Sequence, residues 1–189
     1  AIFGSIGSGR LGDLAGRRGS LLISSGAFLI GGVVMTASSS VSTLVVGRLV
    51  AGFAAGLASA TVNPYIAECS APEVRGAMLS LPQLGVSSGI LISYFVALAA
   101  MMNGVGWRLM LGASLFPAFL QVAAMLALPE SPRWLLTRAK DEAKARIALT
   151  QLRDDQSAEE VEAELKSLRE GLQREAASMS VKAGQGGFA

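Results

Sequence analysis

The 189-residue chain carries 16 basic and 14 acidic residues, no histidine and one cysteine, and hydrophobic residues make up 51% of it. The absence of histidine excludes Ser-His and Cys-His nucleophile systems and histidine-based metal ligation, and one cysteine excludes an intrachain disulfide framework or a multi-cysteine metal site. A net charge of +2 gives no reason to expect a nucleic-acid partner. We therefore expect no catalytic residue, no metal site and no cofactor.

The charges are unevenly distributed along the chain. Residues 130–189 contain 10 basic and 11 acidic residues, which is 21 of the 30 charges. Four earlier stretches carry none: residues 19–47, 49–67, 76–107 and 109–129. Each is long enough, or nearly so, for a helix that crosses the roughly 30 Å hydrocarbon core of a bilayer. The alternative, the buried core of a soluble protein, would need a covering amphipathic layer that this sequence does not supply.

In chain order, the opening AIFGSIGSG is interpreted as the end of a helix already inside the membrane, at about residues 1–8, so a longer protein is expected. A loop at 9–18 follows, and spans are predicted near 20–38, 44–65, 77–99 and 108–128. The loops before the first and third of these spans are rich in arginine and share one side with the charged tail. Because basic residues are retained on the cytosolic side, we expect this side to be cytosolic.

Beyond the last span the pattern becomes amphipathic. Residues 129–175 predict cytosolic helices: a short one at 140–153, and a longer one whose start is marked by a capping box of Ser157 and Glu160. The apolar residues are Ile147, Leu149 and Leu152 on the first, and Val161, Leu165, Leu168 and Leu172 on the second. Residues 1–128 are thus expected to be a transmembrane helical bundle, and residues 176–189 a flexible linker.

Residues 7–18, GSGRLGDLAGRR, begin with a G-x-G-x-x-G pattern. This pattern alone is weak evidence for a dinucleotide loop, which also needs a preceding strand and an acid about 20 residues later. The next acid after Asp13 is Glu68, and the helix that follows is a predicted membrane span. A nucleotide-binding oxidoreductase is therefore not favoured.

Four motifs instead resemble the sugar porter family of the major facilitator superfamily. Residues 9–18 resemble the superfamily signature G-x-x-x-D-x-x-G-R-R, and YIAECSAPEVRG, GWRLMLG and PESPRWLL follow at 65–76, 106–112 and 129–136. The resemblance implies an all-α membrane fold, comprising the second to sixth helices of an amino-terminal six-helix bundle with its cytosolic helices. The matching signature residues are Gly9, Asp13, Gly16, Arg17, Arg18, Glu68, Arg75, Gly76, Glu130 and Arg133.

The resemblance also implies a function. We expect transport of a monosaccharide, a hexose, by alternating access, with protons and the lipid bilayer as further partners and a carboxy-terminal half completing the transporter. The protein would not be an enzyme. The wording of two spans is most similar to tonoplast monosaccharide transporters, so a vacuolar or plasma membrane is expected. A transporter of another small solute and a non-transporting sugar sensor are the alternatives.

Two positions depart from the family pattern. Members commonly place proline two residues before the tyrosine of the second motif, whereas Asn63 stands there in this chain and Pro64 follows. A second glutamine, seven residues after Gln83 in many members, is replaced by Ile90.

Inside the spans, the resemblance implies that Gln83 hydrogen-bonds the sugar, and Ser87 and Ser88 could contribute. The alternative for Gln83 is a hydrogen bond between helices. Arg48 lies within a span, where a charge is costly, and the family pairs an arginine here with an acid of the first helix in proton coupling. The alternative for Arg48 is a side chain that reaches the outer interface.

At the cytosolic side, Gly9 and Gly16 are expected to permit a tight turn, and Asp13 to face the positive end of a helix. The acids and arginines of the motifs are expected to pair as a latch that is assembled when the cytosolic gate is shut. The alternative is a set of ordinary interfacial charges that contribute under about 1 kcal/mol per pair. The expected latch comprises Arg17, Arg18, Glu68, Arg75, Glu130 and Arg133.

Overall fold

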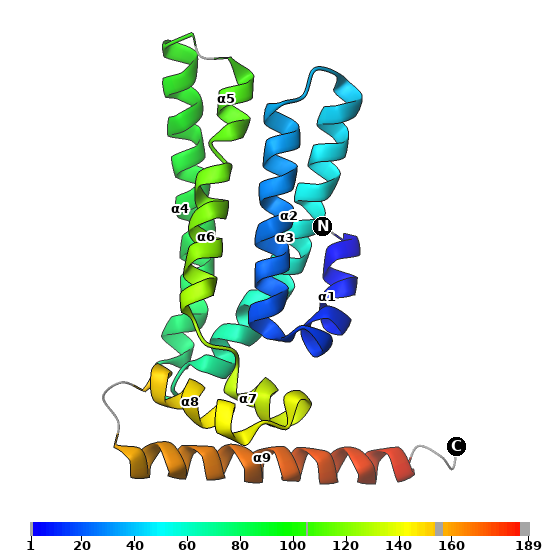
Figure 1. Cartoon of the computed structure of the whole chain (residues 1–189), viewed down its shortest axis with the longest axis vertical. Helices are drawn as coiled ribbons and strands as arrows, with labels where there is room; N and C mark the ends of the chain where they lie inside the picture. Colours follow the sequence, from blue (N-terminus) through cyan, green and yellow to red (C-terminus); the bar gives the residue numbers. More distant parts are fainter. Residues whose placement is uncertain (1, 105, 154–156, 186–189) are drawn as a thin grey trace. The chain divides into compact units, whose positions relative to one another are not determined.

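The computed structural model describes residues 2–104, 106–153 and 157–185, and every regular element in them is a helix (Figure 1). The chain divides into two compact units, Ala1–Glu130 (unit 1) and Ser131–Ala189 (unit 2). Unit 1 contains α1 (Ile2–Leu14), α2 (Gly16–Thr36), α3 (Val41–Cys69), α4 (Arg75–Met102), α5 (Trp107–Gly112) and α6 (Leu115–Ala127). Unit 2 contains α7 (Pro132–Trp134), the π-helical η1 (Leu135–Ala139), α8 (Glu142–Leu152) and α9 (Ala158–Gln185).

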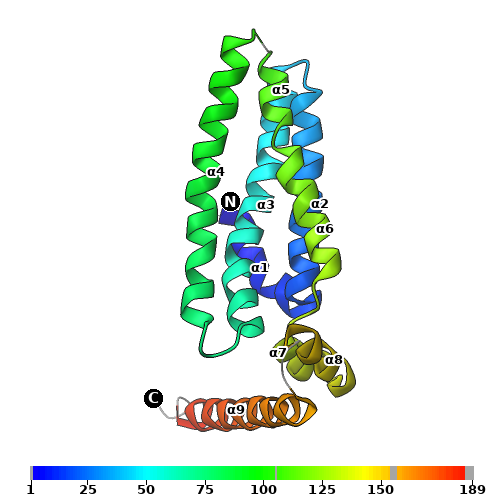
Figure 2. The ribbon, with the colours of Figure 1, turned by 90° about the vertical axis from the view of Figure 1, so that its left-hand side faces the viewer.

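Helices α2 and α3 pack closely because glycines stand where they cross. A Cβ added to Gly31 would lie 3.0 Å from the carbonyl oxygen of Gly47, and one added to Gly47 would lie 3.1 Å from the carbonyl oxygen of Gly31. Small residues at a crossing let two backbones approach within van der Waals contact, which drives helix association in lipid. Helices α4 and α6 stand beside this pair (Figure 2) and bury one side chain each, Ala100 and Ala118.

Four stretches of the described chain are long and apolar enough to cross a membrane, which confirms the predicted spans: Gly16–Thr36, Val41–Cys69, Arg75–Met102 and Met110–Ala127. The sequence predicted one unbroken helix for the last span, at 108–128, but the structure divides it into α5 and α6. The span turns between α5 and α6 because Pro117 has no N–H to donate to the carbonyl of Ala113. That carbonyl instead accepts from the Phe116 N–H at 3.3 Å.

Helix α1 corrects the predicted loop at 9–18. It continues through Gly9 to Leu14, and a Cβ at Gly9 would meet no atom within 4 Å, so the expected tight turn at Gly9 is wrong. The turn lies at Gly16, whose φ of +81° favours glycine. A Cβ there would also lie 2.2 Å from Oε2 of Glu130. Gly16 therefore provides both the turn and the space for a carboxylate.

Unit 2 is built on two helices that run in opposite directions. Its buried core comprises Leu135, Ala145, Ala148, Leu149, Val161 and Leu165. The capping box is confirmed, because the Ser157 N–H donates to Glu160 Oε2 at 2.9 Å and the Glu160 N–H donates to Ser157 Oγ at 3.3 Å. Ion pairs join α8 to α9: Arg146 to Glu162 at 2.7 Å, and Glu142 to Arg169.

Two expectations for unit 2 are corrected. Ile147 was expected on the apolar face, but its side chain is 58% exposed, because the buried face of α8 follows Ala145, Ala148 and Leu149. Helix α9 continues to Gln185, so residues 176–185 of the predicted linker are helical. These residues contain no proline, and their single glycine precedes only the last helical residue, which permits the helix to continue. Residues 186–189 of that prediction lie outside the described residues.

Gly16→Ala is predicted to destabilise the bundle. The added Cβ requires an unfavourable φ and displaces the Glu130 carboxylate, which together should cost about 1–3 kcal/mol. Thermal unfolding of the detergent-solubilised protein, followed by circular dichroism, measures this loss. Gly9→Ala is the matched control and should leave the unfolding temperature equal or higher, since alanine favours a helix interior. Equal unfolding temperatures for the two variants would contradict the assigned turn.

Leu149→Ala is predicted to weaken unit 2 by about 2–5 kcal/mol, because it leaves a cavity in the core. Ile147→Ala, on the exposed side of the same helix, is the control and should change little. Hydrogen exchange of the α8 and α9 amides measures both. Similar loss of protection in the two variants would show that the core has been assigned to the wrong face of α8.

Candidate functional site

The Arg-rich end of unit 1 is the end where α2 begins and where α3 and α6 finish. There the Arg17 guanidinium donates to both carboxylate oxygens of Glu68, from Nε at 3.4 Å and from Nη2 at 3.3 Å. The two side chains are 24% and 13% exposed. This two-pronged geometry fixes orientation as well as charge, so the pair ties α2 to the end of α3.

A second set of bonds ties α2 to α6. Ala15, at the N-cap of α2, provides no side-chain cap, and Glu130 Oε1 accepts the backbone N–H of Arg18 at 3.0 Å instead. In return, the Arg18 guanidinium donates to the carbonyls of Met125 at 2.7 Å and Leu126 at 3.0 Å. The carboxylate meets the positive end of one helix dipole and the guanidinium the negative end of the other.

The other signature residues take no part in the hydrogen bonds just described. Arg75 is exposed at the start of α4 and donates to the Ser70 carbonyl of its own loop at 3.5 Å. Gly76 faces open space. Asp13 is half-buried on α1, and Arg133 is exposed on α7 in unit 2. The structure thus brings together Arg17 with Glu68 and Arg18 with Glu130.

At the opposite end of unit 1, another arginine binds the backbone at the end of α2. Arg108 stacks on the Trp107 ring, with its guanidinium carbon 4.8 Å from the ring centroid. The same guanidinium donates to the Ser38 carbonyl from Nε at 3.1 Å and from Nη2 at 3.0 Å. Ser38 follows the last turn of α2, so this motif caps that helix.

A cavity of about 940 Å³ opens among α2, α3, α4 and α6, and Gln83 lines it. Ser87 and Ser88 do not line it, and the Ser87 hydroxyl donates to the Gln83 carbonyl at 3.1 Å. Sequence reasoning missed Asn63 and Gln121 as lining residues, although a carboxamide in an uncharged apolar stretch is a usable signal. The other lining residues are Phe28, Ala58, Ser59, Val62, Leu79, Pro82, Gly85, Val86 and Pro117.

A second cavity of unit 1, of about 390 Å³, contains Arg48. It is otherwise lined by apolar or small side chains, among them Met35, Ala51 and Met110. The Arg48 side chain is exposed, and it has no hydrogen bond or ion pair within the described residues. An acidic group from outside these residues could approach it without displacing a partner.

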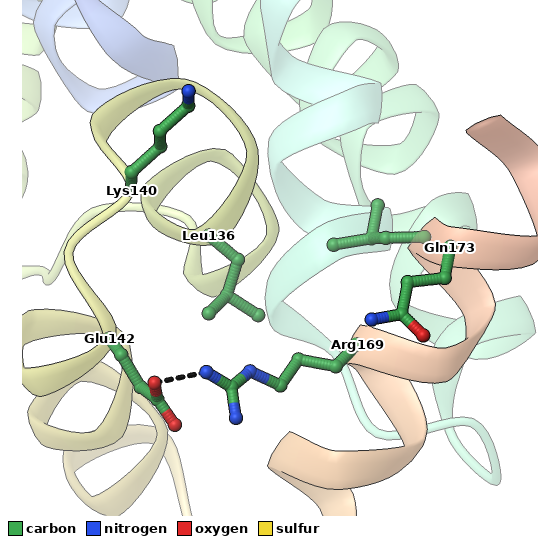
Figure 3. A pocket seen from close by; sticks show the side chains of 6 residues that line it. Leu136, Lys140, Glu142, Arg169 and Gln173 are labelled. Atoms are coloured by element: carbon green, nitrogen blue, oxygen red, sulfur yellow. Dashed lines mark hydrogen bonds and ion pairs between the residues drawn. The ribbon is translucent and has the colours of Figure 1, made fainter.

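Unit 2 has a smaller pocket of about 280 Å³ beside the Glu142–Arg169 ion pair (Figure 3). Leu136 lies against this pair, and Lys140 extends away from it. Among the residues that the structure describes, Glu142 is the one acidic residue that lines this pocket, and Arg169 neutralises its charge. Across the described residues, no group of three or more His, Cys, Asp or Glu side chains is arranged to hold a metal ion.

The model of the "Sugar (and other) transporter" family matches residues 1–185. Inositol transporter 4 of Arabidopsis thaliana is 39% identical over 96% of this chain, and the proton myo-inositol cotransporter of Homo sapiens is 37% identical over 93%. The galactose-proton symporter of Escherichia coli K12 is 36% identical over 92%. The chain spans 30%, 26% and 36% of the lengths of these three relatives, respectively.

Among solved structures, the partially occluded, inward-open form of the xylose transporter XylE from E. coli superposes with a TM-score of 0.77 and 26% identity. The match covers 95% of this chain and 47% of that one. A family match over nearly the whole chain, a shared fold and four candidate spans agree with the motifs at both ends of the bundle. The chain is therefore a multi-pass membrane protein that belongs to the sugar transporter family of the major facilitator superfamily, a family of transporters and not of enzymes.

Proposed function

We propose that this chain is part of the amino-terminal half of a transporter that moves a neutral polyhydroxylated solute, a monosaccharide or a cyclic polyol, by alternating access. The observation that carries the proposal is the cavity of about 940 Å³ between the spans, with the Gln83 carboxamide in its wall. A carboxamide both donates to and accepts from hydroxyl groups. No lining residue carries a charge, so an ionic solute would lose hydration without gaining a partner.

The names of similar proteins support a neutral polyhydroxylated substrate. They include inositol transporters, a glucose transporter and a galactose-proton symporter. A hexose remains our proposal within this class. Contributions from Ser87 and Ser88 stay predictions, since neither lines the cavity.

Proton coupling is the second part of the proposal. Two of the similar proteins are named for coupling to protons. In this chain, Arg48 stands in an apolar cavity with no partner in the described residues, a costly position for a charge in a membrane. We propose that an acid from the part of the transporter beyond this chain pairs with Arg48 when ionised and leaves it when protonated.

The Arg-rich end is proposed to be the cytosolic gate. Basic residues gather there, as expected for the cytosolic side of the vacuolar or plasma membrane. The Arg17–Glu68 pair holds α2 against α3, and the bonds of Arg18 to Met125 and Leu126 hold it against α6, while these charged groups remain shielded from water. Hydration of these charges as the gate opens would weaken them, which suits a latch.

The first test is Gln83→Met in the full-length transporter that contains this chain. It removes the amide at nearly constant volume, so KM for the transported sugar should rise about tenfold, the loss of roughly 1.4 kcal/mol of hydrogen bonding. Uptake of labelled sugar into vesicles measures it. Asn103→Ala is the control, because Asn103 donates to the Ala99 carbonyl at 2.7 Å outside the cavity. Competition by charged solutes, or an unchanged KM in the Gln83 variant, would contradict the proposed site.

The second test reverses the charges of the latch. Arg17→Glu and Glu68→Arg each leave like charges facing one another and should open the Arg-rich end, whereas the double variant restores an opposite pair. The thiol of Cys69, adjacent to Glu68, reports opening through its rate of maleimide labelling in a background without other cysteines. Each single variant should label about tenfold faster or more, with the double variant near the original rate. Equal rates in all four proteins would reduce the pair to an ordinary surface contact.

A further inference from the structure

Three carboxamides share the large cavity of unit 1, each from a different helix. Asn63 comes from α3, Gln83 from α4 and Gln121 from α6. Asn63 and Gln83 are exposed and Gln121 is half-buried. None of the three side chains has a hydrogen bond within the described residues, although each has two N–H donors and a carbonyl acceptor.

This lack of partners sets the three apart from several hydroxyl side chains of the same helices. The hydroxyl of Thr61 on α3 donates to the Leu57 carbonyl at 2.8 Å, and that of Ser80 on α4 donates to the Ala77 carbonyl at 2.6 Å. Such side chains satisfy themselves within their own helix. A carboxamide left without a partner in a lipid-embedded bundle costs several kcal/mol, so these three amides need partners, and a hydroxylated ligand or water in the cavity can supply them.

The remaining lining defines the ligand's chemistry. Phe28 provides an aromatic ring and the other side chains are small or aliphatic, with none charged. A molecule that fits such a surface has apolar C–H faces and hydroxyl groups around its edge. Amides on three helices can reach hydroxyls on different carbons at once, whereas a single amide reads one or two.

We propose that Asn63 and Gln121 are specificity-determining residues that, together with Gln83, hydrogen-bond separate hydroxyls of a neutral ring polyol. This inference rests on the proposed transport function and adds two substrate contacts to it. Each amide reads one region of the ring, so the transporter distinguishes substrates by the presence of individual hydroxyl groups.

The test pairs protein variants with substrate analogues in the full-length transporter. Asn63→Leu and Gln121→Met remove one amide each at similar volume. Singly deoxygenated analogues of the best-transported sugar or polyol each remove one hydroxyl. In the unmodified protein, loss of a contacted hydroxyl should weaken competition for uptake about tenfold.

A direct contact has a distinct signature. The Gln121→Met variant should bind the parent compound about tenfold more weakly than the unmodified protein does. It should bind the analogue that lacks the matching hydroxyl with the same affinity as the unmodified protein. Asn63→Leu should behave in the same way toward a different hydroxyl. Gln151→Met, an identical change on exposed α8, is the matched control and should leave every analogue unaffected.

The outcomes separate the hypotheses. Equal weakening of all analogues would assign Asn63 and Gln121 to contacts with protein and overturn the inference, as would unchanged selectivity in both variants. If a variant fails to reach the membrane, Gln121→Asn and Asn63→Gln replace it, because they keep the amide and change the length of the side chain. An unaltered ranking of the analogues in these two variants would also overturn the inference. Absence of sugar or polyol uptake by the unmodified protein would instead overturn the proposed function.

Discussion

Every helix end leaves backbone groups without a partner in its own helix, and charged side chains pair several of these groups in unit 1. Two arginines donate hydrogen bonds to carbonyl groups at helix ends. Arg18 binds the last carbonyls of α6, and Arg108 binds the carbonyl that follows α2. Glu130 completes the exchange at the Arg-rich end by accepting from the first turn of α2. Charged residues of the motifs therefore have a structural role as helix caps, in addition to any role in the mechanism.

The interior of the bundle follows from the lipid around it. Lipid chains are as apolar as leucine, so α2 and α3 are held by close approach at Gly31 and Gly47, not by the exclusion of water. Helices α4 and α6 keep most of their side chains exposed or half-buried, with Ala100 and Ala118 as their buried residues. Unit 2 is instead held by a buried core of leucine, alanine and valine side chains, with ion pairs between its two longer helices.

Sequence reasoning predicted the spans well, because a helix of this length in a water-soluble protein normally has a charged face, and these stretches have none. It missed the turn before Pro117, since hydropathy does not register a lost backbone hydrogen bond. It placed a turn at Gly9 that the structure places at Gly16, because glycine permits a turn without requiring one. At the candidate site, the resemblance to the family pattern predicted Gln83, which lines the large cavity. Asn63 was noticed only as a departure, and Gln121 only once the fold brought three helices around one cavity.

The hydrogen bonds between Arg18 and α6 bear on which residues related chains can tolerate at this joint. The Arg18 guanidinium holds main-chain oxygens, so the side chains of Met125 and Leu126 have no part in the bond. Substitution at those two positions leaves the accepting carbonyl oxygens in place, so these hydrogen bonds do not require particular side chains there. A comparison of side-chain identities alone would therefore overlook this attachment between α2 and α6.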